Sequence, residues 1–311
     1  MAEAPVPTVP TRRQLRVRLR QLRLATPDPD TGVVPVSASR AARRLGLVPS
    51  TVSRIESGEI EVPKPLYVET LCQFYGADPG ETELLVEAAR TGRRSQRFWF
   101  EEYVARDRDG GPPKFYETYI RMENEATHID QYDDSIVSGL LQTEEYAREL
   151  FSLDPTLAGN RDDVEEQVAI RMGRQKILDR PVGQRPELHV VMDESVLRRP
   201  IGGQLALKRQ LEHLLTASER PNVELQLLPF EAGGHAAMNG GSFIALQFAN
   251  VPGDAGAVYS DNHSGALILE GETDVQRHRT IFASIQQTSA LTAEESRVRI
   301  KVRIKELDAE L

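Results

Sequence analysis

The stretch LGLVPSTVSRIESGE (Leu45–Glu59) has the pattern of two short helices joined by one glycine, and it decides the fold expected for this end of the chain. Gly46 can take the positive φ that ends the first helix and turns the chain sharply. Pro49 suits the first position of the second helix, because no backbone N–H is needed there. Val52 and Ile55 give that helix an apolar edge. The stretch therefore predicts a helix-turn-helix whose second helix turns a polar side to solvent.

The surrounding sequence predicts further helices around this unit. Leu15, Leu19 and Leu22 recur at helical spacing and indicate a first helix with one apolar stripe. The sequence LYVETLCQFYGADPGETELLVEAAR, downstream of the stretch, reads as two more helices. We therefore expect an all-α bundle of four or five helices over residues 12–92, preceded by a Pro- and Ala-rich, disordered lead over residues 1–11.

The string ASRAARRLGLVPSTVSRIESG (Ala38–Gly58), with its first helix expected to start near Ser39, resembles the Xre/Cro-type helix-turn-helix repressor family. The resemblance implies that the second helix lies in the DNA major groove and that a homodimer spans two half-sites. Of the exposed side chains, Arg54 alone can form a bidentate pair with guanine. The residues expected to read bases are Pro49, Ser50, Thr51, Ser53 and Arg54.

Charge is divided unevenly along the chain. The formal net charge is −9, yet residues 1–75 carry eleven basic and seven acidic side chains, so this part has +4 and the remainder −13. Such asymmetry indicates one end that binds a polyanion. The side chains expected at DNA phosphates are Arg13, Arg16, Arg20, Arg40, Arg43 and Lys64.

Two features depart from the family pattern. Residues 26–37 lengthen the connection between the first two helices; their acids Asp28 and Asp30 favour a surface loop, although a role at DNA stays open. Glu59 and Glu61 follow the second helix where a basic side chain would help. We therefore expect weaker DNA binding than the motif alone implies.

The composition shifts after the bundle, and we expect a domain boundary between Thr91 and Gln96, with a second domain over residues 96–311. Trp99, the only tryptophan, is expected to anchor this domain, and a Gly-Gly-Pro-Pro break follows at residues 110–113.

The second domain combines helices and strands. The apolar residues from Phe115 to Ile129 recur at spacings of four and three, which predicts a helix. ELHVVMDE and VELQLLPF read as strands around the helix QLALKRQLEHLLTASE, an arrangement typical of parallel strands. SFIALQFA, AVYS and ALILEG follow at hairpin spacing, so a mixed sheet and an α+β fold are expected. Strict alternation over residues 297–305 slightly favours an edge strand over a helix.

The string VSGLLQTEEYA is similar to the PGLLQT-type motif of an actinobacterial domain of unknown function that follows Xre-type helix-turn-helix domains. Ser138 stands where that family usually has proline. RPELHVVMDESVLRRPIGG and PNVELQLLPFEAGGHAAMNGGSF match it as well. The resemblance implies a transcriptional regulator of the WhiJ-like or antitoxin-like kind.

Polar residues of the second domain leave three readings open: caps and loops, a ligand pocket beside the glycine-rich loop GGHAAMNGGS, or acid–base catalysis by Asp193 and Glu194. We find no nucleophile elbow, phosphate loop or metal-ligand cluster, and His189 and His213 lack partners at ligand spacing. We therefore expect no enzyme, no cofactor and no metal. The candidate pocket residues are Asp193, Arg198, His235, Ser242 and Tyr259.

The sequence as a whole predicts a cytoplasmic, sequence-specific DNA-binding transcriptional regulator. Its partners would be double-stranded DNA, a second copy of the chain, and either a small-molecule effector or a small protein. The sequence contains no run of about 18 apolar residues, so no membrane span is predicted. The alternatives are a hydrolase or transferase, or an interaction scaffold, that uses the helical bundle for assembly.

Overall fold

The computed structural model describes residues 12–60, 63–94, 114–155, 157, 161–248, 254–262 and 265–311. Contacts along the chain form two compact units, Met1–Gln96 with Asn250–Asp254 and Arg97–Ala249 with Ala255–Leu311. The predicted lead, Glu61, Gln96, Trp99 and the Gly-Gly-Pro-Pro break lie outside the described residues.

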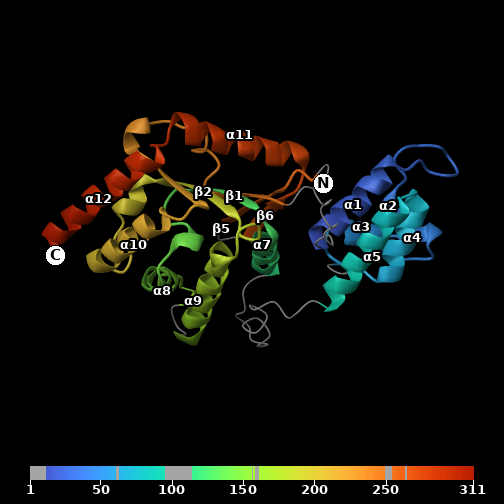
Figure 1. Ribbon diagram of the computed structural model, residues 1–311, viewed down its shortest axis with the longest axis horizontal. Helices are drawn as coiled ribbons and strands as arrows, with labels where there is room; N and C mark the ends of the chain where they lie inside the picture. Colours follow the sequence, from blue (N-terminus) through green and yellow to red (C-terminus); the bar gives the residue numbers. More distant parts are fainter. Residues whose placement is uncertain are drawn as a thin grey trace, which may run out of the picture. The chain divides into compact units, whose positions relative to one another are not determined.

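The first unit is helical throughout its described elements (Figure 1), which confirms the predicted bundle. Its helices are α1 (Arg12–Ala25), α2 (Ala38–Arg44), α3 (Thr51–Glu56), α4 (Pro65–Tyr75) and α5 (Pro79–Arg94). Leu15 and Leu19 of α1 are each 1% exposed and share one apolar core with Ala42, Val52 and Ile55. The small, buried Ala42 side chain lets α2 and α3 pack closely.

The ends of α2 and α3 differ slightly from the predicted ones. Ser37, not Ser39, caps α2, because its hydroxyl accepts the backbone N–H of Arg40 at 3.2 Å. Gly46 has φ +67 and makes the turn after α2, as predicted. Pro49 precedes Ser50, the N-cap of α3, and so lies outside the helix instead of opening it.

The insertion at residues 26–37 folds back on the bundle. Asp28 accepts backbone N–H groups of Asp30 and Thr31 at 3.0 and 3.2 Å, and its carboxylate also binds Arg40 at 2.7 Å. Val36 is fully buried in the core of the unit. The insertion is therefore an ordered loop with its own hydrogen bonds and an apolar anchor.

The second unit is a mixed sheet with helices on both faces, which confirms the predicted α+β class. Its helices are α7 (Lys114–Glu125), α8 (Glu144–Ser152), α9 (Arg161–Gln175), α10 (Gln204–Ala217), α11 (Glu272–Thr288) and α12 (Ala293–Glu310). Its strands are β1 (His128–Asp133), β2 (Glu187–Asp193), β3 (Val223–Leu228), β4 (Phe243–Gln247), β5 (Ala257–Asn262) and β6 (Gly265–Leu269). Short 3₁₀ turns are η1 (Gly139–Leu141), η2 (Lys176–Asp179), η3 (Glu194–Leu197) and η4 (Phe230–Ala232).

The strand order is β3-β2-β1-β4-β5-β6. β2 pairs in parallel with β1 and β3, as the predicted crossover requires, and β4, β5 and β6 continue the sheet in antiparallel pairs. None of the helices in the described part of the chain is long and apolar enough to cross a membrane.

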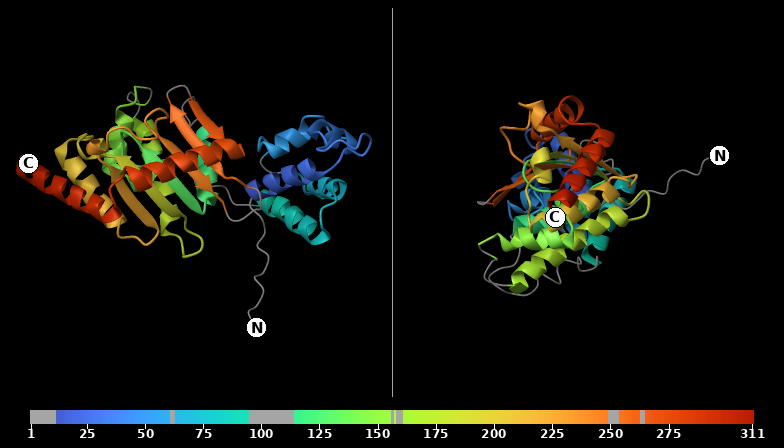
Figure 2. Two further views of the ribbon diagram at one scale, coloured as in Figure 1. Left: turned by 90° about the horizontal axis from the view of Figure 1, so that it is seen from above. Right: turned by 90° about the vertical axis from the view of Figure 1, so that its left-hand side faces the viewer.

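Helices cover both faces of the sheet (Figure 2), and an apolar core lies on each face. On one face Tyr132 and Phe243 pack against Phe282 of α11. On the other face Ile129 and Leu188 belong to a larger core, to which α7, α8, α9, α10 and α12 all contribute. Successive residues of a strand point to opposite faces, so β1 contributes to both cores.

Strand β1 was not predicted. The helical spacing that begins at Phe115 continues formally to Ile129, but α7 ends at Glu125 and Ile129 enters the core from the strand. The sequence HIDQYD is polar, yet Asp130, Gln131 and Asp133 are all buried. A polar strand buried on both faces carries no apolar pattern that would reveal it.

The predicted edge strand at residues 297–305 is wrong, because this segment lies within helix α12. Thr292 and Glu295 form a capping box, in which the Thr292 hydroxyl accepts the Glu295 N–H at 3.2 Å and the Glu295 carboxylate accepts the Thr292 N–H at 2.9 Å. Ile300 and Leu307, seven residues apart, are fully buried, whereas Val298 is 51% exposed. The period-two alternation therefore does not follow burial.

We predict that Gly256→Ala disrupts the second unit. Gly256 has φ +100, and a Cβ atom there would overlap the carbonyl oxygen of Leu246 on β4. The expected loss of unfolding free energy is about 3 kcal/mol or more, measured by urea denaturation. Gly265→Ala is the control, because Gly265 also has a positive φ (+144) but no atom lies within 4 Å of its Cβ position. It should cost only about 1–2 kcal/mol, and equal losses would contradict the steric explanation.

Candidate functional site

The exposed side of α3 carries the residues expected to read DNA bases. Val52 and Ile55 are each 1% exposed and hold the helix on the core. On the other side Ser50, Ser53 and Arg54 face solvent and Thr51 is half-buried, while Pro49 is exposed just before the helix. The fold thus presents these side chains as the sequence predicts, and their contact with DNA stays a prediction.

Arg54 has an internal partner. Its Nε donates a hydrogen bond to the Glu59 carboxylate at 2.7 Å, and the two side chains are 49% and 61% exposed. Such an exposed ion pair contributes about 0–1 kcal/mol, so a base edge can replace it. The Ser53 hydroxyl donates to the backbone carbonyl of Ser50 at 2.9 Å and keeps its own lone pairs for a further donor.

Two of the arginines expected at DNA phosphates are held inside the unit. Arg13 is 4% exposed and lies 3.0 Å from the carboxylate of Asp254, a residue that groups with the first unit. The structure therefore places the Arg13 guanidinium at an internal carboxylate and not on the exposed surface, which disfavours the predicted phosphate contact. Arg40 is half-buried and bound by Asp28 and Asp30, so most of its charge is neutralised.

The other expected phosphate contacts are accessible to different degrees. Arg20, Arg43 and Lys64 are exposed and form no ion pair with any residue that the structure describes. Lys64 places its ammonium 5.4 Å from the ring centre of Tyr67. Arg16 is half-buried and covers the end of α3, where a Cβ added to Gly58 would lie 3.1 Å from its Nη1.

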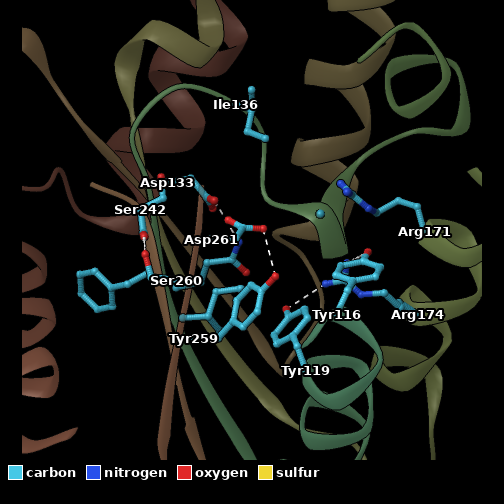
Figure 3. A pocket seen from close by; sticks show the side chains of 14 residues that line it. Tyr116, Tyr119, Asp133, Ile136, Arg171, Arg174, Ser242, Tyr259, Ser260 and Asp261 are labelled. Atoms are coloured by element: carbon cyan, nitrogen blue, oxygen red, sulfur yellow. Dashed lines mark hydrogen bonds between the residues drawn. The ribbon is translucent and has the colours of Figure 1, made fainter. Parts of the chain in front are cut away.

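The second unit contains a cavity of about 100 Å³ between α7, α9 and one face of the sheet (Figure 3). Side chains from β1, β4 and β5 form its floor. The residues that line it are Tyr116, Tyr119, Gln131, Asp133, Ile136, Gly139, Arg171, Arg174, Ser242, Phe243, Ile244, Tyr259, Ser260 and Asp261.

Asp133 is the central acidic group of this cavity. It is 7% exposed; its Oδ1 accepts a hydrogen bond from Gln131 at 3.0 Å, and its Oδ2 has no hydrogen-bond partner among the described residues. Burial raises the pKa of Asp133 to about 7, the Gln131 hydrogen bond opposes this, and the negative charges of Asp134 and Asp261 add to it. The group can therefore exchange a proton near neutral pH.

Two arginines lie on the helical side of the cavity, and only one has capacity left for a ligand. Arg174 is buried and binds the Glu123 carboxylate at 2.7 and 2.8 Å, so Glu123 is an internal counter-ion. The hydroxyls of Tyr116 and Tyr119 lie 2.6 and 2.9 Å from the same guanidinium. Arg171 donates to Gln142 at 2.6 Å, whereas its buried Nε has no partner in the described part of the chain.

An aromatic wall closes the cavity at β5. The rings of Tyr119 and Tyr259 are stacked, with centroids 4.0 Å apart and planes 20° from parallel. The Tyr259 hydroxyl donates to Asp261 at 3.1 Å, and burial raises the pKa of Tyr259 far above its usual range. Stacking and hydrogen bonding fix this wall, so the cavity is largely pre-formed.

The structure divides the five predicted pocket residues. Ser242 and Tyr259 line the cavity, but Asp193, Arg198 and His235 do not. Asp193 caps η3 by accepting the Ser195 N–H at 2.8 Å. Arg198 lies 3.5 Å from Glu306 of α12, and the His235 ring packs edge-on against Tyr132 at 5.7 Å. These three residues therefore lie outside the lining of this cavity.

Sequence reasoning missed the two most distinctive groups of the cavity. Asp133 lies on the unpredicted strand β1, and Arg171 lies on α9, where no motif marks it. It also found no partner for His189, yet the Asp130 carboxylate lies 3.6 Å from the His189 ring on the neighbouring strand. The omissions of Asp133 and of the His189 partner follow from β1, because pairing between distant strands leaves no local spacing to detect.

Two parts of the chain match known family models. Residues 14–85 match a family model described as a helix-turn-helix domain. Residues 116–302, more than half of the chain, match a family model described as a domain of unknown function (DUF5753). No curated protein and no solved structure matches the chain.

We predict that Asp133→Asn changes how stability depends on pH. With a pKa of about 7 in the folded chain against 3.8 in the unfolded one, native Asp133 keeps a proton that the unfolded chain has lost. Wild-type stability should therefore fall as pH rises from about 4 to about 7. Relative to the wild type, the variant should gain about 2–3 kcal/mol between pH 5 and pH 8, measured by urea denaturation. The same pH dependence in both proteins would contradict a buried, proton-retaining carboxyl.

Proposed function

We propose that this chain, which belongs to the DUF5753 family and carries a helix-turn-helix domain at its N-terminal end, is a sequence-specific transcriptional regulator of the Xre/Cro type. The observation that carries the proposal is the exposed polar side of α3, held outward by the buried Val52 and Ile55. In helix-turn-helix proteins this second helix enters the major groove. The regulator acts in the cytoplasm and needs no cofactor.

Charge and hydrogen bonding have separate tasks in the proposed contact with DNA. Arg20, Arg43 and Lys64, which are exposed, release counterions from phosphates and set the position of the domain on the duplex. Arg54 leaves Glu59 and pairs with a guanine, which discriminates by about 1–3 kcal/mol against a wrong base. A homodimer places two such helices about one helical turn apart.

The second unit regulates DNA binding in this proposal, and the cavity around Asp133 is the proposed effector site. An unpaired buried polar group costs about 1–3 kcal/mol, and Asp133 Oδ2 and Arg171 Nε have no hydrogen-bond partner within the described ranges. A ligand that satisfies both presents a hydrogen-bond donor to the carboxylate and an acceptor to the guanidinium. A small amphoteric molecule, such as an amino acid, meets these requirements and is compatible with about 100 Å³.

A small protein partner is the second candidate for this unit. The resemblance of VSGLLQTEEYA to the WhiJ-like and antitoxin-like regulators of streptomycetes supports it. Capture of a small protein by the full chain, with no thermal shift from any amphoteric small molecule, would favour the partner over the effector.

We assign no catalytic step to this unit. The acid–base pair considered from the sequence is held in structural contacts: Asp193 caps η3, and the Glu194 carboxylate binds Arg299 at 2.9 Å. Glu194 is also 2% exposed, which keeps it from a substrate. These contacts support a regulator over a hydrolase or transferase.

We predict different effects of Arg54→Ala and Arg43→Ala on DNA binding by the full chain. Arg54→Ala should lower the preference for the operator over random DNA by about 5- to 150-fold, because one base contact of about 1–3 kcal/mol is lost. Arg43→Ala, the control, should weaken binding to both DNAs equally and reduce the salt dependence, the slope of log K against log salt, by about one. Competition binding at several salt concentrations measures both quantities.

The opposite outcome would indicate that the helical bundle serves assembly and does not read DNA. If the wild type binds operator and random DNA equally and Arg54→Ala changes nothing, α3 does not read DNA. The bundle would then serve the enzyme or scaffold alternatives.

We predict that amphoteric small molecules raise the melting temperature of the full chain through the Asp133 cavity. A thermal-shift screen of free amino acids should give hits that vanish in Asp133→Asn and persist in Asp193→Asn, because Asp193 lies outside the cavity lining. If the same molecules raise the melting temperature of both variants equally, the effector site does not lie in this cavity.

A further inference from the structure

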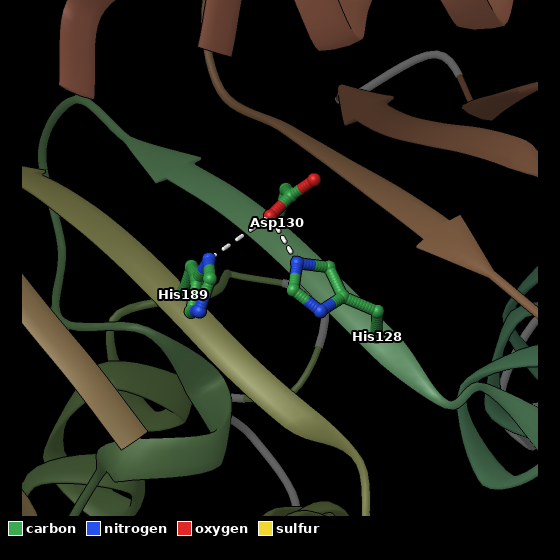
Figure 4. A group of neighbouring side chains, drawn as sticks. All are labelled: His128, Asp130 and His189. Atoms are coloured by element: carbon green, nitrogen blue, oxygen red, sulfur yellow. Dashed lines mark hydrogen bonds and ion pairs between the residues drawn. The ribbon is translucent and has the colours of Figure 1, made fainter. Parts of the chain in front are cut away.

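Three side chains on the sheet face opposite the cavity converge on one point (Figure 4). His128 and Asp130 are alternate residues of β1, so they project from the same face. His189 on β2 is the register partner of Asp130 in the parallel pair. Gln131 and Asp133, which line the cavity, occupy the intervening positions of β1 and point the other way. The cluster is therefore separate from the proposed effector site.

The donor atoms lie close enough to share one ion. His128 Nε2 is 2.9 Å from Asp130 Oδ1, His189 Nδ1 is 3.6 Å from the same oxygen, and all three lie within 4.8 Å of one another. Ligands held at about 2.0–2.2 Å around a tetrahedral ion are separated by about 3.4 Å. The imidazole rings are nearly perpendicular, at 83° with centroids 4.5 Å apart. Small side-chain rotations would therefore bring all three donors to one ion.

Groups around the cluster support the orientation that coordination requires. A ligating histidine usually turns its other ring nitrogen to a carboxylate, and His189 Nε2 lies 3.9 Å from Glu224 on β3. Gln286 donates to the other Glu224 oxygen at 3.3 Å and holds that carboxylate in place. Gln247 donates to Asp130 Oδ2 at 3.4 Å, which leaves Oδ1 directed at the histidines.

We propose that His128, Asp130 and His189 bind a divalent transition-metal ion of the Zn²⁺ class. Two imidazoles and one carboxylate suit this class better than Mg²⁺ or Ca²⁺, which prefer oxygen ligands. The histidine side chains are 28% and 30% exposed, so an ion has access from solvent. Three protein ligands leave a fourth position for water or for a donor from another molecule. The ion joins the central strands β1 and β2.

Calorimetric titration of the full chain, without an affinity tag and after chelator treatment, tests the site with Zn²⁺ as the probe. The wild type should bind one ion per chain. His128→Ala and His189→Ala should each weaken binding more than about tenfold, and Glu224→Gln by about 10- to 100-fold through the orientation of His189. His213→Ala on α10 removes a histidine outside the cluster and should leave affinity unchanged.

X-ray absorption of the Zn²⁺-loaded wild type gives the ligand set directly and does not depend on whether the variants fold. Two imidazole ligands and oxygen donors are expected, and both should disappear from the double variant His128→Ala/His189→Ala. Equal Zn²⁺ affinity in the wild type and this double variant would overturn the site. An ion bound without histidine would overturn it as well. Neither outcome bears on the DNA-binding proposal, because the test contains no DNA.

Discussion

The pairing of β1 on both of its edges is the constraint on which the second unit depends. β1 runs parallel to β2 on one side and antiparallel to β4 on the other, so it joins the two halves of the sheet. Its alternation sends Asp133 to the cavity and Asp130 to the two histidines. A shift of one residue in this register would exchange the faces and abolish both sites. Two functional hypotheses therefore rest on one strand of six residues.

Buried charge gives the cavity its chemical character. The Arg174–Glu123 pair is almost fully buried, at 5% and 1% side-chain exposure, and two tyrosine hydroxyls complete its hydrogen bonds. Removing one partner of such a pair leaves a buried, uncompensated charge, so either substitution would destabilise the unit. Among the described residues Asp133 has no comparable counter-ion, and burial raises its pKa instead. The unit thus pairs one buried charged group internally, and the proposed effector site is built around the other.

In the first unit, internal ion pairs determine which arginines remain for DNA. Arg18 is bound by Glu81 and Arg23 by Glu56, in addition to the pairs that hold Arg13 and Arg40. Four of the eleven basic side chains in residues 1–75 are therefore paired with acidic side chains of the unit. Specificity in this account depends mainly on Arg54, whose pairing with Glu59 is exposed and weak.

Local patterns in the sequence predict this fold well, and long-range pairing explains the failures. The helix-turn-helix follows from Gly46, Val52 and Ile55, because the turn and the apolar edge are both local. The parallel strands β2 and β3 were found from their apolar alternation. In contrast, β1 is polar, and the alternation within the α12 segment does not follow burial. Contacts with distant segments determine the structure of both elements.

The same distinction applies to the sites. The exposed face of α3 could be predicted, because helical periodicity determines which residues face solvent. Arg13 could not be excluded from DNA contact, since its partner Asp254 lies far along the chain. Asp133, Arg171 and the His128–Asp130–His189 cluster likewise depend on contacts between distant segments.

Footprinting of the full chain on its own promoter shows whether α3 reads an operator. Two related half-sites about one helical turn apart should be protected, and the protection should persist in excess random DNA. Uniform protection that random DNA removes completely would contradict operator reading by α3.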